Sequence, residues 1–116
     1  VLASDIDAVA VEVAETNVRL NGLEGRVICL EAAGFDSDAL HAAAPFDLVF
    51  ANILKGPLVA LAPDMAAHLA PGGFAILSGI LNEQAEAVIE VYARHGFNLV
   101  EHQSIVDWST LTLRRM

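Results

Sequence analysis

The stretch FDLVFANILKGPLVALAPDMAAHLAPGGFAILS, residues 46–78, decides the fold class. Its two ends, residues 46–51 and 74–78, are short apolar runs with the length of buried strands. Between them, Pro57 stands near the first turn of a helix that is predicted to run to about Leu69. A strand, a helix and a second strand in this order predict a crossover between parallel strands, and therefore an α/β protein.

The same alternation continues outward in both directions. The Pro-Gly-Gly triplet at Pro71 predicts a tight turn, and Gly22 and Gly96 predict helix ends. The last two strands alternate in polarity around a short loop at Val106, which favours an antiparallel hairpin. The predicted strands are residues 1–4, 26–31, 46–51, 74–78, 97–103 and 108–114, and the predicted long helices are 9–20, 56–69 and 82–95. A short Ala-rich helix, capped by Asp36 or Ser37, is predicted to run through Ala44. No linker, repeat or low-complexity tract interrupts the pattern, so we expect one domain over residues 1–116.

Composition narrows the class of protein. Hydrophobic residues make up 55% of the 116 residues, which is enough apolar material for a core. No apolar run has the length of a membrane span, and Val1 does not begin a signal peptide, so a soluble, cytoplasmic protein is expected. The net charge is −9 with six Lys and Arg, too few cations for direct nucleic-acid binding.

Several kinds of chemistry are not expected. Cys29 is the single cysteine and lies in an apolar run, so it predicts a buried structural thiol and neither a disulfide nor a thiolate metal site. The four histidines are scattered without carboxylates or cysteines at metal spacing, so no metal site is expected. Neither a phosphate-binding P-loop nor the Gly-x-Ser-x-Gly elbow of hydrolases occurs.

Ligands of open α/β sheets bind beyond the carboxyl ends of the strands, which directs attention to the residues there. Asp5 ends the first predicted strand and can accept hydrogen bonds from both hydroxyls of a ribose. Alternatively, Asp5 or Asp7 caps the helix that follows, and Asp7 stands where an N-cap belongs. The loop at Ala33-Gly34 has room for a flat purine, which Ile6 could cover, although an ordinary turn also explains it.

Asn52 follows the strand that ends at Ala51. A buried amide among apolar neighbours is costly unless it has partners, so this position favours a functional role. Its carbonyl oxygen can accept a hydrogen bond from a substrate amine and aim the nitrogen lone pair at a methyl donor. The alternative is an amide that bonds to its own loop backbone. Gly79, in the Ser-Gly-Ile-Leu segment, permits close backbone approach or positive φ, and a plain turn explains it equally well. Trp108 is interpreted as a strand residue that packs on the sheet.

Together these segments resemble one family over essentially the whole chain, the bacterial methyltransferases of the large-subunit ribosomal protein L11. The segments that carry the resemblance are SDID (4–7), ETNVRLNG (15–22), FDLVFANIL (46–54), LAPGG (69–73), SGIL (78–81) and DWSTL (107–111). The Leu-x-Pro-Gly-Gly turn is shared by many class I methyltransferases. The Ala-Asn-Ile-Leu and Ser-Gly-Ile-Leu pair, in this order and at this separation, is more specific.

The resemblance implies a Rossmann-like class I sheet and methylation of lysine side chains and the amino terminus of a ribosomal protein, with S-adenosyl-L-methionine (AdoMet) as the methyl donor. It implies that Asp5 holds the cofactor ribose, that Ile6, Ala33 and Gly34 flank the adenine, and that Asn52 lies beside the reacting methyl and amine.

The chain also departs from the family pattern. A complete member has a substrate-binding domain, a first strand and a glycine-rich loop before the position of Val1, and no Gly-x-Gly-x-x-Gly occurs here. We therefore expect a carboxy-terminal piece of the catalytic domain, with weak AdoMet binding and with strand edges free for self-association. Two alternatives stay open: a non-catalytic α/β interaction module, and the half of a nicotinamide-binding dehydrogenase, in which Asp5 would also bind ribose.

Overall fold

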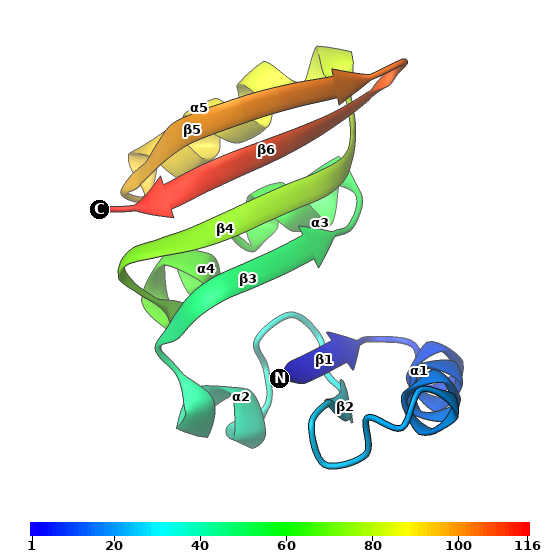
Figure 1. Cartoon of the computed structure of the whole chain (residues 1–116). Coiled ribbons are helices and arrows are strands. Elements are labelled where there is room, and N and C mark those ends of the chain that lie inside the picture. The colour runs from blue at the N-terminus through cyan, green and yellow to red at the C-terminus, as the bar shows by residue number, and fades with distance from the viewer. The chain divides into compact units, whose positions relative to one another are not determined.

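The computed structural model describes residues 1–116, and the chain forms two compact units, Val1–Ala42 and Ala43–Met116. The expectation of one domain over the whole chain stays a prediction. The elements follow the predicted order, with strands and helices alternating until the final hairpin (Figure 1).

The first unit contains two short parallel strands and a capped helix. β1 (Leu2–Asp5) pairs with β2 (Ile28–Glu31), and the register places Asp5 beside Glu31. α1 (Ala8–Leu20) connects them, and a short helix, α2 (Asp38–Ala43), follows β2. The predicted cap is confirmed, since Asp7 Oδ1 accepts a hydrogen bond of 2.9 Å from the Val9 backbone N–H.

α1 buries only a narrow face within its own unit. Val11 is 8% exposed, whereas Val9 and Val13 are 65% and 55% exposed. The apolar positions that predict the helix are therefore not all core positions of this unit. The helix ends as expected, because Gly22 follows with φ +66°, a left-handed conformation that glycine adopts without steric cost.

The second unit is a mixed sheet of four strands in the order β3-β4-β6-β5 (Figure 1). β3 (Phe46–Asn52) runs parallel to β4 (Leu69–Leu81). β6 (Trp108–Arg115) is antiparallel to β4 and forms a hairpin with β5 (Phe97–Ile105). The predicted crossover and hairpin are thus confirmed.

The prediction of one helix over residues 56–69 is wrong. The structure has α3 (Lys55–Ala60) and α4 (Ala62–His68), with Leu61 between them. Pro63 explains the interruption, because it has no N–H to donate to the preceding turn. After β4, a 3₁₀ turn (Asn82–Gln84) leads into α5 (Ala85–Arg94).

The core of the second unit lies between one face of the sheet and the helices α3, α4 and α5, which lie behind the sheet in Figure 1. Tyr92 connects the layers, because its hydroxyl donates to the Leu58 carbonyl at 2.8 Å and its ring meets Phe97 edge-on with centroids 5.4 Å apart. The core residues with no exposed surface are Leu58, Ala62, Met65, Ala75, Leu77, Ile80, Val88, Tyr92 and Leu111.

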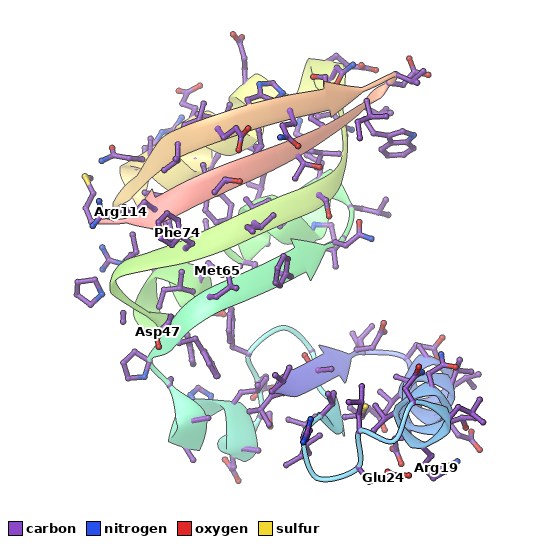
Figure 2. The ribbon with its side chains drawn as sticks, in the orientation of Figure 1. Arg19, Glu24, Asp47, Met65, Phe74 and Arg114 are labelled. Carbon is purple, nitrogen blue, oxygen red and sulfur yellow. The ribbon has the colours of Figure 1, made fainter.

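The opposite face of this sheet exposes apolar side chains. Leu48 and Phe50 on β3 are 49% and 72% exposed, and Phe74 on β4 is 38% exposed. Phe74 lies beside Arg114, its register partner on β6 (Figure 2). Alternation along each strand places these residues away from the helices of this unit.

β4 is longer than predicted and carries two irregularities. The predicted tight turn at Pro71 is an irregularity within β4. The pairing with β3 shifts register between the Phe46–Leu69 and Leu48–Phe74 pairs, and Gly72 in this segment has φ +84°. The second shift lies between Leu77 and Ile80, where pairing with β6 is interrupted.

Strand pairing leaves two edges without a partner strand. β1 pairs with β2 alone, and β3 pairs with β4 alone, so one edge of each strand has no neighbour in its own sheet. Among the helices, none is both long and apolar enough to cross a membrane.

Candidate functional site

The candidate residues of the first unit gather at the carboxyl ends of β1 and β2. Asp5 ends β1, and its backbone carbonyl accepts a hydrogen bond of 3.0 Å from the Ala32 N–H directly after β2. Ile6 follows Asp5, and Ala33 follows Ala32. Because the two strands are parallel neighbours, all four predicted residues, Gly34 included, lie at one edge of this unit.

Asp5 is held by its own loop but retains acceptor capacity. Its Oδ1 accepts a hydrogen bond of 2.9 Å from the Asp7 N–H, whereas its Oδ2 accepts no hydrogen bond from the protein. The side chain is exposed. Asp7, and not Asp5, caps α1. The carboxylate of Asp5 is therefore oriented and accessible, which suits acceptance of hydrogen bonds from hydroxyl groups of a ligand.

A tight turn follows β2. The Asp36 N–H donates to the Ala33 carbonyl at 3.0 Å, and Gly34 has φ +58°. Phe35 is buried beneath this turn, whereas Ala33 and Gly34 are exposed. Ile6 is 71% exposed. An exposed isoleucine and a backbone with small side chains offer apolar surface beside the Asp5 carboxylate.

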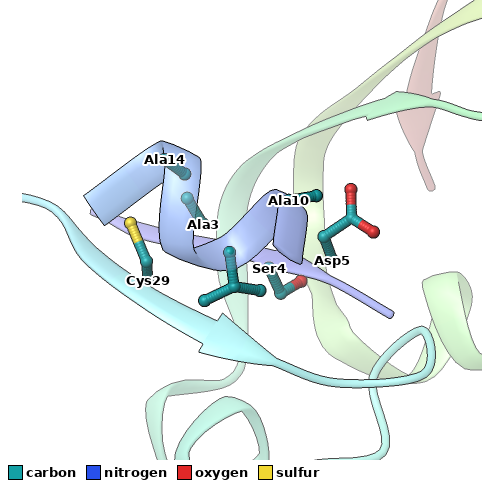
Figure 3. A pocket seen from close by; sticks show the side chains of 7 residues that line it. Ala3, Ser4, Asp5, Ala10, Ala14 and Cys29 are labelled. Atoms are coloured by element: carbon teal, nitrogen blue, oxygen red, sulfur yellow. The ribbon is translucent and has the colours of Figure 1, made fainter. Parts of the chain in front are cut away.

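A small hollow of about 110 Å³ lies between β1, α1 and β2. Small side chains line it, with Cys29 at one end and Asp5 at the other (Figure 3). Ligand pockets usually measure about 300 to 1,000 Å³, so this hollow is too small for a nucleoside. Cys29 is partly exposed, which corrects the expectation of a fully buried thiol.

Asn52 is the candidate residue of the second unit and ends β3 opposite Ser78 of β4. The second irregularity of β4 begins beside this pair, because Gly79 has φ +82° and the ladder to β6 resumes only at Ile80. A β-bulge of this kind commonly reorients side chains next to a functional site. Gly79 is therefore not part of a plain turn between elements.

Gly79 packs directly against Asn52. A Cβ atom at Gly79 would lie 2.5 Å from Asn52 Oδ1 and 3.0 Å from the Ile53 carbonyl oxygen. The first distance is far below van der Waals contact, so only glycine allows Asn52 this position. The interpretation of Gly79 as a close-approach residue is confirmed.

An open surface cavity of about 360 Å³ lies beside the bulge, at the carboxyl ends of β3 and β4. This volume lies in the range of small-molecule sites. Its lining combines an amide, three hydroxyl groups, a glycine and one aromatic ring, from Asn52, Ser78, Gly79, Trp108, Ser109 and Thr110. The lining contains hydrogen-bonding groups but no charged side chain.

Asn52 differs in one respect from the expectation. Asn52 is exposed, so the prediction of a buried amide that needs partners is wrong. The amide also makes no hydrogen bond to its own loop, and therefore the backbone-bonded alternative has no support either. An accessible amide with both its donor and its acceptor free can serve a ligand.

Sequence reasoning missed Trp108 and Thr110. Trp108 is 53% exposed and lines the cavity, whereas packing on the sheet is predicted for it. The signal that identifies both residues is spatial: β6 lies next to β4 and begins at the end where β3 and β4 finish. A sequence-only reading does not provide that register.

The structure therefore brings four predicted residues together in the first unit and places Asn52 in the second. The convergence of Asp5 and Asn52 on one crevice stays a prediction. No group of three or more His, Cys, Asp and Glu side chains is arranged to hold a metal ion.

Comparisons with known proteins give one consistent family. A family model described as "Ribosomal protein L11 methyltransferase (PrmA)" matches residues 1–116. A protein named ribosomal protein L11 methyltransferase from Agrobacterium fabrum is 50% identical over 117 residues, which cover 99% of this chain and 39% of the relative. A protein of the same name from Bradyrhizobium diazoefficiens is 50% identical over 116 residues, 100% of this chain and 39% of the relative. The chain thus spans about two fifths of the length of these relatives.

Solved structures agree at the level of the fold. A ribosomal protein L11 methylase from Lactobacillus delbrueckii subsp. bulgaricus matches with a TM-score of 0.88 and 30% identity, covering 99% of this chain and 57% of that one. A methyltransferase from Pyrococcus furiosus matches with a TM-score of 0.76 over 97% of this chain and 60% of that one, at 20% identity. The expected Rossmann-like methyltransferase architecture is confirmed.

Proposed function

Because the chain belongs to the ribosomal protein L11 methyltransferase family, we propose that it forms part of a class I catalytic domain that transfers methyl groups from AdoMet to amines of a ribosomal protein. The match of the family model over residues 1–116 is the observation that carries this proposal. Since the chain corresponds to 39% of the relatives' length, the activity is proposed for the longer protein. Both units would then be parts of one catalytic domain.

Lysine side chains and the amino terminus are the proposed acceptors. An acidic chain with net charge −9 suits a basic protein substrate and not direct contact with nucleic acid. A ribosomal substrate also fits a reaction in the cytoplasm. The resemblance to the family implies these acceptors, and peptide mapping of the methylated product tests them.

The residues at the edge of the first unit fit the nucleoside part of AdoMet. Asp5 Oδ2 has no protein donor and can accept hydrogen bonds from ribose hydroxyls. Ile6, which is 71% exposed, can cover one face of the adenine, and the small residues Ala33 and Gly34 allow it close to the backbone. When bound, AdoMet would supply a sulfonium-activated methyl group.

Asn52 would orient the acceptor amine. Free lysine has a pKa of about 10.4, and only its neutral form has the lone pair needed for attack. Asn52 Oδ1 can accept one N–H of that neutral amine and direct the lone pair. No carboxylate lines the 360 Å³ cavity, so its residues provide orientation and not a general base. Alignment of reactants can lower a barrier by roughly 7 to 11 kcal/mol in favourable cases.

The direct test is a chimera. This chain would replace the matched 39% of the Agrobacterium fabrum relative, and transfer of radiolabelled methyl from AdoMet to purified ribosomal protein L11 would be measured. We expect transfer, with the label on lysine side chains and the amino terminus by peptide mapping. Asn52→Ala should lower turnover by more than about tenfold while it leaves the AdoMet KM nearly unchanged, because it removes an interaction with the amine.

Asn98→Ala is the matched control, because Asn98 is an exposed asparagine of β5 in the same sheet and does not line the cavity. It should behave like the unmodified chimera. A folded chimera that transfers no methyl, although the relative itself does, would favour the alternative of a non-catalytic α/β module. Unchanged turnover in Asn52→Ala would remove Asn52 from the mechanism.

A further inference from the structure

At the carboxyl end of α1, the C-cap residue Asn21 is followed by Gly22. Asparagine before glycine is chemically labile, because glycine has no side chain to hinder attack of its backbone nitrogen on the preceding side-chain amide. The other asparagines of the chain precede a bulkier residue, namely Val18, Ile53, Glu83 or Leu99. Asn21 is therefore the asparagine whose sequence most favours this attack.

The structure leaves room around this dipeptide. Asn21 and Gly22 are both exposed, in the turn between α1 and β2. Arg19 and Glu24, which lie on either side of the dipeptide along the chain, are labelled in Figure 2. A Cβ atom built on Gly22 would meet no atom within 4 Å, so no neighbouring group crowds the space in which a ring would close.

Hydrogen bonds hold the dipeptide in an unreactive form. The Gly22 N–H donates to the Arg19 carbonyl at 3.1 Å. The side-chain Nδ2 of Asn21 donates to the Asn17 carbonyl at 2.7 Å. Ring closure requires that the Gly22 nitrogen lose its hydrogen and that the Asn21 side chain rotate toward it. Both hydrogen bonds must therefore open before the reaction.

The end of α1 is weakly anchored within its own unit. Among the 13 residues of this helix, Val11 alone is buried, and it lies more than two turns before Asn21. Leu20, the last helical residue, is 78% exposed. Opening of the last turn therefore exposes little additional apolar surface. Helix ends that bury little open at a low free-energy cost, so the reactive form is accessible.

We propose that Asn21 is a site of spontaneous modification: when the last turn of α1 opens, the Gly22 nitrogen attacks the side-chain amide, and Asn21 becomes aspartate and isoaspartate. The nitrogen gives its proton to solvent base and forms a bond to Asn21 Cγ, the Cγ–Nδ2 bond breaks, and Nδ2 leaves as ammonia with a proton from solvent. Water then adds to the cyclic imide. Cleavage of the bond from the nitrogen to Cγ gives aspartate, and cleavage of its bond to the main-chain carbonyl carbon gives isoaspartate.

Either product weakens the end of α1. The new carboxylate replaces the Nδ2 donor to the Asn17 carbonyl, and it places a negative charge where the helix dipole is already negative. Isoaspartate also adds a methylene group to the main chain. The Leu23 N–H, which donates to the Val18 carbonyl at 3.0 Å in the Schellman motif of this helix end, would be displaced from it. The inference does not rest on the proposed function, because the reaction uses only this dipeptide and water.

The test incubates the folded chain at mildly alkaline pH in heavy-oxygen water and maps its peptides by mass spectrometry. We expect conversion of amide to acid with incorporation of heavy oxygen at Asn21, in aspartate and isoaspartate forms. The other asparagines should stay unmodified over the same period, and they are Asn17, Asn52, Asn82 and Asn98.

Hydrogen exchange of the Gly22 amide measures the opening independently, because the same N–H must be released. The folded chain should be modified more slowly than the chain denatured in guanidinium chloride. The two slowing factors, for modification and for exchange of the Gly22 amide, should agree within roughly fivefold.

Two variants separate the dipeptide from its place in the fold. Asn21→Gln keeps an exposed amide on a longer side chain and should remove the reaction at this position. Leu99→Gly creates the same dipeptide at Asn98, an exposed residue of β5 whose backbone pairs with β6. With the fold retained by circular dichroism, Asn98 in this variant should react several-fold more slowly than Asn21, because a paired strand opens less readily than a helix end.

An unmodified Asn21 in the folded chain, after the denatured chain has reacted, would overturn the inference. So would a rate at Asn98 in Leu99→Gly that equals or exceeds the rate at Asn21, since the dipeptide alone would then control the reaction. Slowing factors for modification and for Gly22 exchange that differ by more than about fivefold would exclude opening of the last turn as the controlling step.

Discussion

At the scale of single residues, Asn52 and Gly79 depend on one another. Asn52 can be identified from the sequence because it directly follows an apolar strand of an α/β protein. Its partner cannot be identified in the same way, because the contact with Gly79 arises from the register of β3 and β4 and from a bulge. The place of Trp108 at the cavity likewise depends on the register of β4 and β6, so the sequence predicts only a strand residue there.

Gly79→Ala should displace Asn52. The new Cβ would lie 2.5 Å from Asn52 Oδ1, and the left-handed backbone at φ +82° adds a strain of roughly 1 to 2 kcal/mol. We expect the side-chain amide signals of Asn52 to shift in an NMR spectrum and the unfolding free energy to fall in a denaturant titration. Gly25→Ala is the control, because Gly25 also has φ +82° but has no neighbour within 4 Å. If both variants leave the Asn52 signals in place, the proposed dependence is wrong.

Tyr92 gives the core a dependence on alkaline pH. Burial raises the pKa of its phenol above the ordinary value of 10.0. The folded state therefore favours the protonated form, and its contribution to stability is complete below pH 10 and declines as the pH rises above it. Tyr92→Phe should lose about 1 to 3 kcal/mol at neutral pH, because the Leu58 carbonyl loses its donor. The unfolding free energy of Tyr92→Phe should fall less steeply above pH 10 than that of the unmodified chain; equal slopes would contradict this origin.

At the scale of elements, local signals predicted most of the structure. Periodicity and turn residues identified every strand, and Asp7 was correctly placed at the start of α1. The single helix over 56–69 failed at Pro63, where a missing N–H outweighs the apolar periodicity on either side. The turn at Pro71 became an irregularity within β4, because the strand continues pairing on both sides of it.

Asp7→Ala should destabilise the first unit through α1. The change removes the acceptor for the Val9 N–H, and loss of such a cap costs about 0.5 to 2 kcal/mol. Hydrogen exchange of the α1 backbone amides reports the local stability of this helix. Exchange should become faster in α1 and change little in α5. Asp36→Ala provides a control aspartate outside any helix. Similar acceleration in both variants would show that charge, and not capping, is responsible.

At the scale of the whole molecule, the sequence predicts the parallel crossover and the terminal hairpin but not which side chains act together. β1 and β3 each have one edge without a partner strand in their own sheets. Neighbouring strands within one sheet can be inferred from an α/β pattern, and so the edge at Asp5, Ile6, Ala33 and Gly34 was predictable. Whether that edge and Asn52 share a ligand depends on tertiary placement, which local patterns do not encode.

The unpaired edges and the absence of a glycine-rich motif predict how the 116 residues behave alone. We expect weak or undetectable AdoMet binding by calorimetric titration, because no Gly-x-Gly-x-x-Gly is available to approach the methionine end. We also expect concentration-dependent self-association in sedimentation velocity, since free strand edges pair readily. Sub-micromolar AdoMet affinity in a strictly monomeric chain would contradict both expectations.

Asp5 and Asn52 are proposed to serve one reaction from the two units, and steady-state kinetics of the chimera test this most directly. Asp5→Ala should raise the AdoMet KM by about tenfold or more with a smaller change in kcat, because it removes hydrogen bonds to the ribose. Asn52→Ala should do the opposite, lowering kcat with little change in the AdoMet KM. If Asp5→Ala leaves the AdoMet KM unchanged, Asp5 does not bind the ribose, and if Asn52→Ala leaves kcat unchanged, Asn52 does not orient the amine.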